Sequence, residues 1–589
     1  MPNSSPGSPD AKNPMAGDRL AQARRDVGLS QKALAERLGI SLWSLDQLEQ
    51  GRGELNAHLP AITDATGMHA GWFGGTRAAN LDQVIGRLAA EIRLELGYPL
   101  RPGPTAADAV PPDRAPIQAR VRRLAARRQT GRDLVLSSIG LLVLIRFFTE
   151  IVPVLPRAAN FIDVPIFLVL ALAGTLRSHG ERKIGRSYIS LAVPAFLFIG
   201  LSAVSVAVNP SRVEAGPVLV FLYGFLAPMG VYAAVYRLWP AGRALSLSRL
   251  LVGLTLLQLL VVFLIDLPRF LASNDPDLIS GTFGTNPYQL VFYLLVATGL
   301  LAGIFTVEKG RMAARLAPLL IILILATTLL AQYRALLVTT GVTIVLIAII
   351  LRGRARGIIA GALIAISLAF TFSYVASNFP GLRFASTFST LHNSPGYYAS
   401  QRLKTASNVL SLYTDDPRFM VTGTGPGTFS SRGWYTFASV KSKSRSNVQG
   451  PYVSALTGGR VYHTDVSDKY VLSTSRSRTA IQGSRAVTSP FASYLSLLAE
   501  VGLAGFILLV GMYGWATVQA LSMTARSLRR RVPRDPLPAL LLASSVAFTV
   551  LLQMAFLDNW LEVTRVTFIA WILLAVGSKE FDARERTVE

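Results

Sequence analysis

Residues 286–306 have the sequence NPYQLVFYLLVATGLLAGIFT, which contains no Lys, Arg, Asp or Glu. A helix of about 20 apolar residues crosses a hydrocarbon core of ~30 Å. Because backbone amides in lipid need partners within their own segment, such a block favours a helix. Similar blocks recur along the chain and predict about twelve spans. We expect them near 134–153, 160–176, 188–208, 216–236, 248–266, 286–306, 315–331, 335–352, 357–377, 492–520, 537–557 and 563–578.

The composition agrees with a membrane protein, since 51% of the 589 residues are hydrophobic and only 16% are charged. Cysteine is absent, which excludes disulfides and thiolate metal sites, and the five histidines lack the spacing of metal ligands. We therefore expect neither a metal nor another cofactor.

Lys and Arg are concentrated in every second loop between the apolar blocks. Short cytoplasmic loops of membrane proteins are rich in Lys and Arg, so we attribute the net charge of +24 mainly to topology. With the N-terminus inside, the short inner loops are all basic, at 177–186, 237–249, 309–315, 352–356 and 526–534. The sequence thus predicts an all-α fold: a polytopic, multi-pass membrane protein, with both termini in the cytoplasm and a small N-terminal helix-turn-helix domain.

Shifts in composition predict the domain boundaries. We expect a disordered tail at 1–14, a helix-turn-helix domain at 15–75, a helix with a Pro/Ala linker and a basic juxtamembrane segment at 76–132, a membrane domain at 133–578 and a cytoplasmic tail at 579–589. The membrane domain includes a large outer loop at 378–489, which contains 13 Lys and Arg against four Asp and Glu. Long loops are largely exempt from the orientation rule, so this charge indicates either an anionic ligand or attraction to anionic headgroups.

The N-terminal domain is indicated by residues 28–41, GLSQKALAERLGIS. Ser30 and Ser41 can cap two successive helices, and Gly39 permits a tight turn between them. We expect the core to be formed by Leu34, Leu38, Ile40, Leu45 and Leu48. The stretch resembles the phage-repressor-like helix-turn-helix family, including its Glu49-Gln50-Gly51 ending.

That resemblance implies DNA contacts from Gln31 and from the second helix of the motif, with Ser41, Ser44 and Gln47 as the candidates. The chain departs from the family pattern at Leu42 and Trp43, where polar side chains usually meet bases. An exposed aromatic residue suits a protein contact. The predicted partner of residues 15–75 is therefore DNA or a cytoplasmic protein, and a vestigial domain is the third alternative.

Four stretches of the membrane domain resemble the O-antigen ligase/polymerase family of membrane glycosyltransferases. They are SGTFGTNPYQL at 280–290, YRALL at 333–337, the segment from Arg402 to GTGPGTF at 423–429, and SYL at 493–495 followed by Glu500 and GLAG at 502–505. Each stretch alone has an ordinary packing explanation. Their order, and the large outer loop before the last three spans, carry the resemblance.

The resemblance implies transfer of a glycan from a polyprenyl pyrophosphate carrier on the outer face of the bacterial plasma (inner) membrane. Arginine can bind the pyrophosphate through bidentate hydrogen bonds without a metal. Arg334 and Arg402 are the predicted catalytic arginines. Arg269, Tyr494 and Gly425 are the predicted substrate-binding residues, and the predicted partners are the lipid-linked glycan and membrane lipids.

One departure concerns the general base. The family commonly has a His-Asn pair before its Tyr-Leu motif, and this chain has Phe491-Ala492 there. His463, in the same loop, is the predicted catalytic substitute. The alternatives are an inactive member that only binds the carrier, and a membrane-tethered sensor without chemistry.

Charged residues within the blocks are the last signal, because ionisable groups in a membrane default to pairing or function. Arg146 and Glu150 are four residues apart on one helix face, which predicts a structural ion pair. We expect Glu500 to serve helix packing or to line the outer cavity rather than to act as the base.

Overall fold

The computed structural model describes residues 20–24, 29–50, 58, 61–62, 64–65, 114–178, 186–273, 278–284, 286–307, 312–331, 339, 341, 350, 396–437, 462, 464–472, 492–530, 535–557 and 559–588. The chain divides into two compact units, Met1–Arg127 and Arg128–Glu589.

The N-terminal unit contains α2 (Gln31–Leu38) and α3 (Leu42–Glu49), and both predicted caps are confirmed. Ser30 Oγ accepts the Ala33 N–H at 3.1 Å, and Ser41 Oγ accepts the Ser44 N–H at 3.1 Å. Gly39 ends α2 in the left-handed region, at φ 66°. The predicted core is confirmed as well: Leu34, Leu45 and Leu48 are buried, and Leu38 and Ile40 pack against them.

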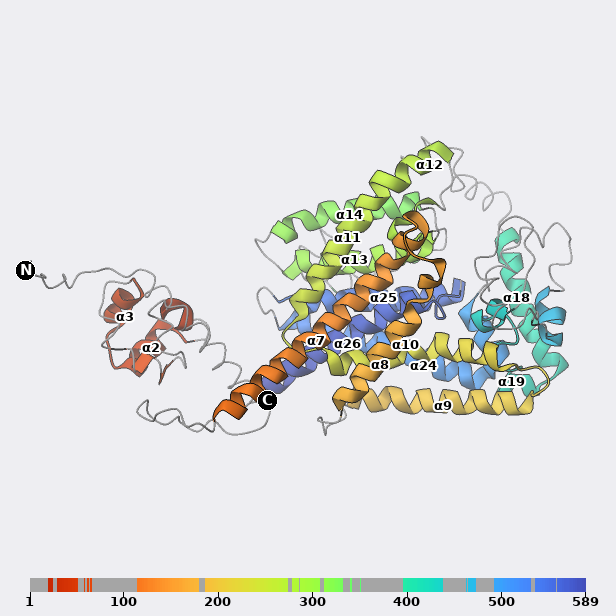
Figure 1. The fold of residues 1–589 in the computed structure, drawn as a ribbon, viewed down its shortest axis with the longest axis horizontal. Helices are drawn as coiled ribbons and strands as arrows, with labels where there is room; N and C mark the ends of the chain where they lie inside the picture. Colours follow the sequence, from red (N-terminus) through yellow and green to blue (C-terminus); the bar gives the residue numbers. More distant parts are fainter. Residues whose placement is uncertain are drawn as a thin grey trace, which may run out of the picture. The chain divides into compact units, whose positions relative to one another are not determined.

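The second unit is a bundle of helices (Figure 1). Its α-helices are α7 (Arg114–Arg146, whose first residues belong to the N-terminal unit), α8 (Asp163–Ser178), α9 (Arg186–Val208), α10 (Ala215–Leu238), α11 (Ala244–Val261), α12 (Leu267–Ser273), α13 (Pro287–Val307), α14 (Met312–Leu330), α18 (Gly396–Asp415), α19 (Arg418–Thr422), α20 (Arg432–Phe437), α24 (Ser493–Arg529), α25 (Leu537–Leu557) and α26 (Thr564–Val588). Short 3-10 or π segments are η1 (Phe147–Ile151), η2 (Arg157–Phe161), η3 (Val262–Asp266), η5 (Gly281–Phe283) and η6 (Ser467–Leu472).

Eight helices among the described residues are long and apolar enough to cross a membrane. A ninth apolar helix, Arg315–Leu330, is shorter. The predicted span at 248–266 is longer than expected, because α11 continues through η3 into α12 as far as Ser273. The predicted spans at 335–352 and 357–377 lie outside the described residues. The all-α membrane fold is thus confirmed, and the count of twelve stays a prediction.

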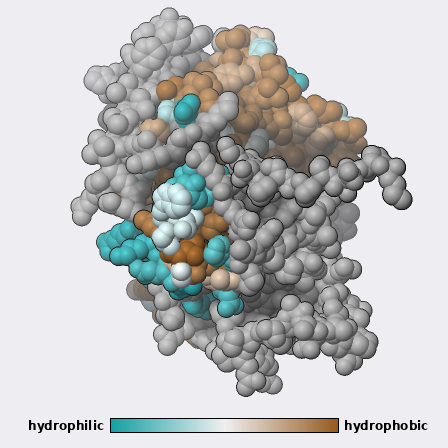
Figure 2. All heavy atoms as spheres, turned by 90° about the vertical axis from the view of Figure 1, so that its left-hand side faces the viewer, coloured by the Kyte–Doolittle hydropathy of each residue, from teal (hydrophilic) through white to brown (hydrophobic). Residues whose placement is uncertain are grey.

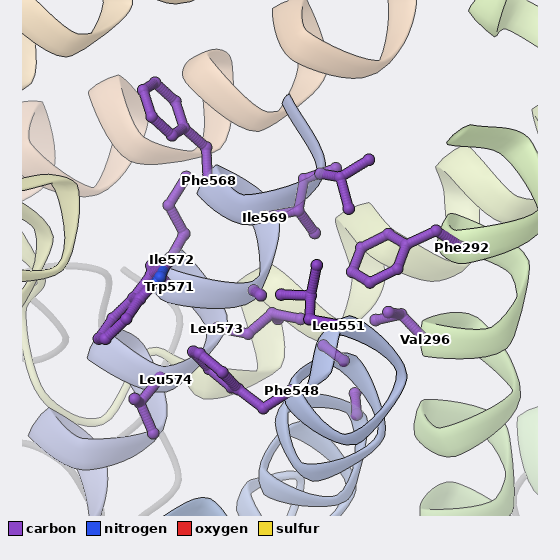
Figure 3. Close-up of a cluster of buried hydrophobic side chains, with 14 of the residues drawn as sticks. Phe292, Val296, Phe548, Leu551, Phe568, Ile569, Trp571, Ile572, Leu573 and Leu574 are labelled. Atoms are coloured by element: carbon purple, nitrogen blue, oxygen red, sulfur yellow. The ribbon is translucent and has the colours of Figure 1, made fainter. Parts of the chain in front are cut away.

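The core of the bundle lies between α13, α25 and α26. Helix α13 is almost entirely buried, as expected for an apolar block without a polar face. Its Phe292 and Val296 face Leu551 of α25 (Figure 3). Trp571 of α26 meets Phe548 edge-on, with ring centroids 5.0 Å apart. The apolar block at 286–306, which contains no charged residue, therefore forms part of the core of the bundle.

Large apolar side chains also cover the outside of the helices. Figure 2 shows such a surface in brown on the described residues. On α9, Phe196 is 73% exposed, and in η3, Leu264 is 67% exposed. An exposed apolar surface of this extent is unfavourable in water but suits lipid, which agrees with the membrane assignment.

Two contacts outside the predicted spans agree with the predicted alternation of sides. At one end, Glu580 accepts the N–H groups of Gly242 and Arg243, both at 2.8 Å, and all three residues were placed inside. At the other end, Asn209 donates to the Gly423 carbonyl at 3.2 Å, and both were placed outside. The two ends are thus distinct, while their assignment to cytoplasm and exterior remains a prediction from charge.

Candidate functional site

The Gly-rich segment 423–429 folds around the carboxylate of Glu500, which is fully buried on α24. The two carboxylate oxygens accept four backbone N–H groups at 2.6 to 3.0 Å, from Gly427, Phe429, Ser430 and Ser431. Hydrogen bonds to a charged acceptor are about twice as strong as neutral ones. Glu500 therefore fixes the turn, and the expected packing role is supported over a role as base.

Close backbone contact joins the same turn to α24. The Thr424 N–H donates to the Ala499 carbonyl at 2.9 Å, and the Gly425 N–H donates to the Glu500 carbonyl at 3.0 Å. Helix α24 is broken at Gly502, which has φ 67°. A Cβ at Gly502 would lie 2.4 Å from the Val421 carbonyl oxygen, and one at Gly423 would lie 2.3 Å from the Glu500 carbonyl oxygen. Glycine is required at both positions by conformation and by space.

A second turn, at 280–284, is held in a similar way by Asp266. Its Oδ2 accepts the Ser280 N–H at 3.0 Å and the Gly281 N–H at 2.6 Å. Gln258 Oε1 accepts the Thr282 N–H at 2.8 Å. Asp266 ends the π segment η3, and π segments inside helices are frequent at functional sites. Two of the four motif stretches are thus turns fixed by buried carboxylates.

Tyr462 and residues 464–472, in the predicted outer loop, pack against the Glu500 turn. The Thr464 hydroxyl donates to the Thr428 carbonyl at 2.7 Å. At the surface, Lys469 donates to Asp415 at 2.6 Å, and the Tyr470 hydroxyl donates to the same carboxylate. The hydrogen bond from Lys469 is the main reason that the pKa of Asp415 is lowered, and it raises the pKa of Lys469.

The loop between α25 and α26 connects the motifs further. Ser493 Oγ donates to Asn559 Oδ1 at 2.8 Å and accepts the Leu561 N–H at 3.2 Å. Glu562 Oε2 accepts the Arg432 N–H at 2.5 Å, next to the peptide that Glu500 binds. Burial, followed by the charge of Glu500, raises the pKa of Glu562 to about 8. This loop therefore places a second buried carboxyl group beside the Gly-rich turn.

The predicted catalytic and substrate-binding residues lie in different parts of the chain, and only some of them are within the described residues. Arg334 and His463 lie outside the described residues, and Arg402 lies in α18 with its side chain outside them. Arg269 is exposed on α12. Gly425 is buried in the turn, at φ 112°.

Tyr494 packs between helices. Its hydroxyl donates to the Leu552 carbonyl at 2.8 Å, and its ring meets Phe506 edge-on at 5.7 Å. Its predicted contact with substrate stays a prediction. The predicted ion pair of Arg146 with Glu150 is confirmed, at 3.3 Å.

Three charged residues of this end with very low exposure were missed by the sequence reasoning. Asp266, Glu562 and Arg565 are all at most 4% exposed. Asp266 and Arg565 stand at the ends of predicted spans, and a charge within an apolar block is the signal that could have found them. Nothing in the periodicity distinguishes Glu562 from an ordinary loop residue.

In the N-terminal unit, three of the predicted DNA contacts make hydrogen bonds within the fold. Gln31 donates to Glu49 at 2.8 Å, and Arg24 binds the same carboxylate at 2.6 Å. The hydroxyls of Ser41 and Ser44 lie 2.8 Å apart at the start of α3.

The exposed surface of α3 is apolar at its start. Leu42 is 53% exposed and Trp43 is 72% exposed, while Gln47 is half-buried on the same helix. Base recognition usually needs hydrogen-bonding side chains at such positions. Residues 16–69 match the family described as helix-turn-helix domain, so the chain carries an N-terminal domain of this family and a body of membrane-span-like helices.

Proposed function

We propose that the membrane body is a glycan ligase or polymerase that transfers lipid-linked oligosaccharide from a polyprenyl pyrophosphate on the outer face of the plasma membrane. The observation that carries this proposal is the attachment of the turn at 423–429 to α24 through Glu500. Two of the stretches that resemble the O-antigen ligase/polymerase family thereby form one structural unit. The regulatory role falls to the N-terminal domain.

The chemistry fits the charges of the chain. The acceptor hydroxyl oxygen forms a bond to the anomeric carbon, the bond from that carbon to the pyrophosphate breaks, and a base takes the hydroxyl proton. Arg334 and Arg402, with Arg269, are proposed to stabilise the departing pyrophosphate. His463 is the proposed base. The excess of positive charge in the loop 378–489 supports an anionic substrate.

A deletion strain tests this function directly. Wild type, Arg334→Ala, Arg402→Ala and His463→Ala are restored separately, and surface glycan and lipid-linked intermediates are measured. Loss of surface glycan with accumulated intermediates in both arginine variants is the expected result. Arg418→Ala is the matched control, because Arg418 is exposed in the same outer loop and bound to Asp416. An unchanged glycan profile in the deletion strain would refute the transferase.

A second candidate function is a membrane-tethered DNA-binding regulator, and the match of residues 16–69 favours it. Exposed Leu42 and Trp43 favour a protein partner instead. DNA binding by the full-length protein in nanodiscs is measured by electrophoretic gel shift at increasing salt concentration. Binding through phosphate contacts should weaken as the salt concentration rises. Absence of binding even at low salt would exclude this candidate and leave a protein partner or a vestigial domain.

A further inference from the structure

Arg565 is the most deeply buried arginine among the described residues, at 4% exposure near the start of α26. One terminal nitrogen, Nη2, donates to the backbone carbonyl of Asn160. The other, Nη1, has no hydrogen-bond partner within the described part of the chain. A buried guanidinium with an unused donor is costly, so its retention inside an apolar block indicates a ligand with acceptor oxygens.

A second arginine with an unused donor is attached to the same segment. Arg146, near the end of α7, binds Glu150 at 3.3 Å, and its buried Nε likewise has no partner among the described residues. Asn160 connects the two arginines, because its side-chain amide donates to Glu150 at 3.1 Å while its carbonyl accepts from Arg565. Arg146 and Arg565 are near enough for their positive charges to repel each other. Two unused guanidinium donors are therefore gathered around one residue.

The carboxylates of this cluster are engaged elsewhere. Asp163 accepts the Thr564 hydroxyl at 2.6 Å and the Tyr223 hydroxyl at 3.2 Å. Glu150 already binds Arg146 and Asn160, and a Cβ at Gly284 would lie 2.1 Å from its Oε2. Both acids offset the arginine charges over distance, but neither hydrogen-bonds Arg565 in the described residues.

The surroundings are apolar on the outside. Between α7 and α8, Val154 is 70% exposed, Leu155 is 43% exposed and Phe161 is 50% exposed, and Asn160 lies within this segment. The site is thus at the predicted outer end of three spans, beside exposed apolar side chains. Such a combination of guanidinium donors and exposed apolar side chains suits a phosphate that carries a hydrocarbon chain.

We propose that Arg146 and Arg565 bind the phosphate or pyrophosphate group of a membrane lipid. The assignment of that lipid as a polyprenyl pyrophosphate rests on the proposed function, whereas the anion site does not. Arg146 and Arg565 are then lipid-phosphate ligands additional to the arginines of the motif stretches, and Asn160 is the residue that positions them.

The test uses the full-length protein in phosphatidylcholine nanodiscs with farnesyl pyrophosphate as the probe. Binding is measured at equilibrium with radiolabelled probe, and thermal unfolding is followed by tryptophan fluorescence. We expect at least ten-fold weaker binding in Arg146→Gln and in Arg565→Gln. Arg212→Gln is the matched control at the same end, because Arg212 binds Asp465 at 2.8 Å, and its affinity should equal that of wild type.

Unchanged affinity in both folded variants, or no binding of the probe to wild type, would overturn the site. If Arg565→Gln does not fold, the affinity of Arg146→Gln tests the site. The thermal shift of the wild-type protein tests it independently: farnesyl pyrophosphate should raise the unfolding temperature, and farnesol, which lacks the pyrophosphate, should not. If phosphatidylglycerol displaces the radiolabelled probe as well as unlabelled farnesyl pyrophosphate does, the site is supported with a phospholipid as its ligand. If inorganic pyrophosphate does so, the site is supported with the head group alone as its ligand. Arginine-dependent binding together with an unchanged cellular glycan would refute the transferase and retain the site.

Discussion

The carboxylate of Glu500 accepts the backbone N–H of Gly427 at 2.6 Å, although 73 residues separate them in the sequence. Three further N–H groups, from residues 429 to 431, bind the same carboxylate. This one side chain therefore determines the shape of a turn that lies 73 residues before it in the sequence.

Replacement of Glu500 by glutamine should destabilise the protein by roughly 1–3 kcal/mol, because the amide NH2 would take the place of Oε2 and leave the buried Gly427 N–H without an acceptor. Thermal unfolding in detergent measures the loss. Asp133→Asn removes an exposed carboxylate and should change the unfolding temperature little. A Glu500→Gln protein as stable as wild type would contradict the anchoring role.

Gly502→Ala should be strongly destabilising, since the backbone at φ 67° and ψ −175° costs an alanine roughly 1–3 kcal/mol and its Cβ would collide with the Val421 carbonyl. Gly511→Ala is the matched control on the same helix. A Cβ there meets nothing within 4 Å, so this variant should be neutral or slightly more stable. The two unfolding temperatures, compared in one detergent, check the prediction, and equal values would disprove it.

Stability should fall as the pH rises from about 4.5 to about 8, in proportion to the titration of Glu562. Burial raises its folded-state pKa to about 8 from an ordinary value of 4.5, so over this window the folded protein holds a proton that the unfolded chain has lost. The unfolded state binds fewer protons, and the free energy of unfolding therefore decreases with pH.

Unfolding temperatures between pH 5 and pH 9 measure this slope. Glu562→Gln should flatten it, because a glutamine keeps an acceptor for the Arg432 N–H and does not titrate. The exposed Glu214→Gln should leave the slope as in wild type. An identical slope in Glu562→Gln would show that another group is responsible.

Arg24→Gln should destabilise the N-terminal unit by about 3 kcal/mol, because it leaves the carboxylate of Glu49 buried without its cation. The side chains of this pair are only 13% and 7% exposed. Thermal unfolding of residues 1–127, which form a compact unit, measures the effect. Lys32→Gln is the control on exposed α2 surface, and a loss of similar size there would argue against a specific role of the ion pair.

The sequence by itself determined the parts that depend on local pattern. Apolar block length predicted the helices, and the spacing of Ser30, Gly39 and Ser41 predicted two capped helices and their turn. The i, i+4 spacing of Arg146 and Glu150 predicted their ion pair. These features require only neighbours within one or two helical turns, so periodicity and capping chemistry are sufficient.

Only the tertiary structure decided which distant groups meet. Glu500 has the turn at 427–431 as its partner, Asp266 binds residues 280 and 281, and Arg565 reaches the carbonyl of Asn160. A buried carboxylate or guanidinium requires hydrogen-bond partners, but the backbone groups that can serve are chemically alike along the whole chain. Which of them come within 3 Å is fixed by the packing of the helices, and no local pattern of residues encodes that.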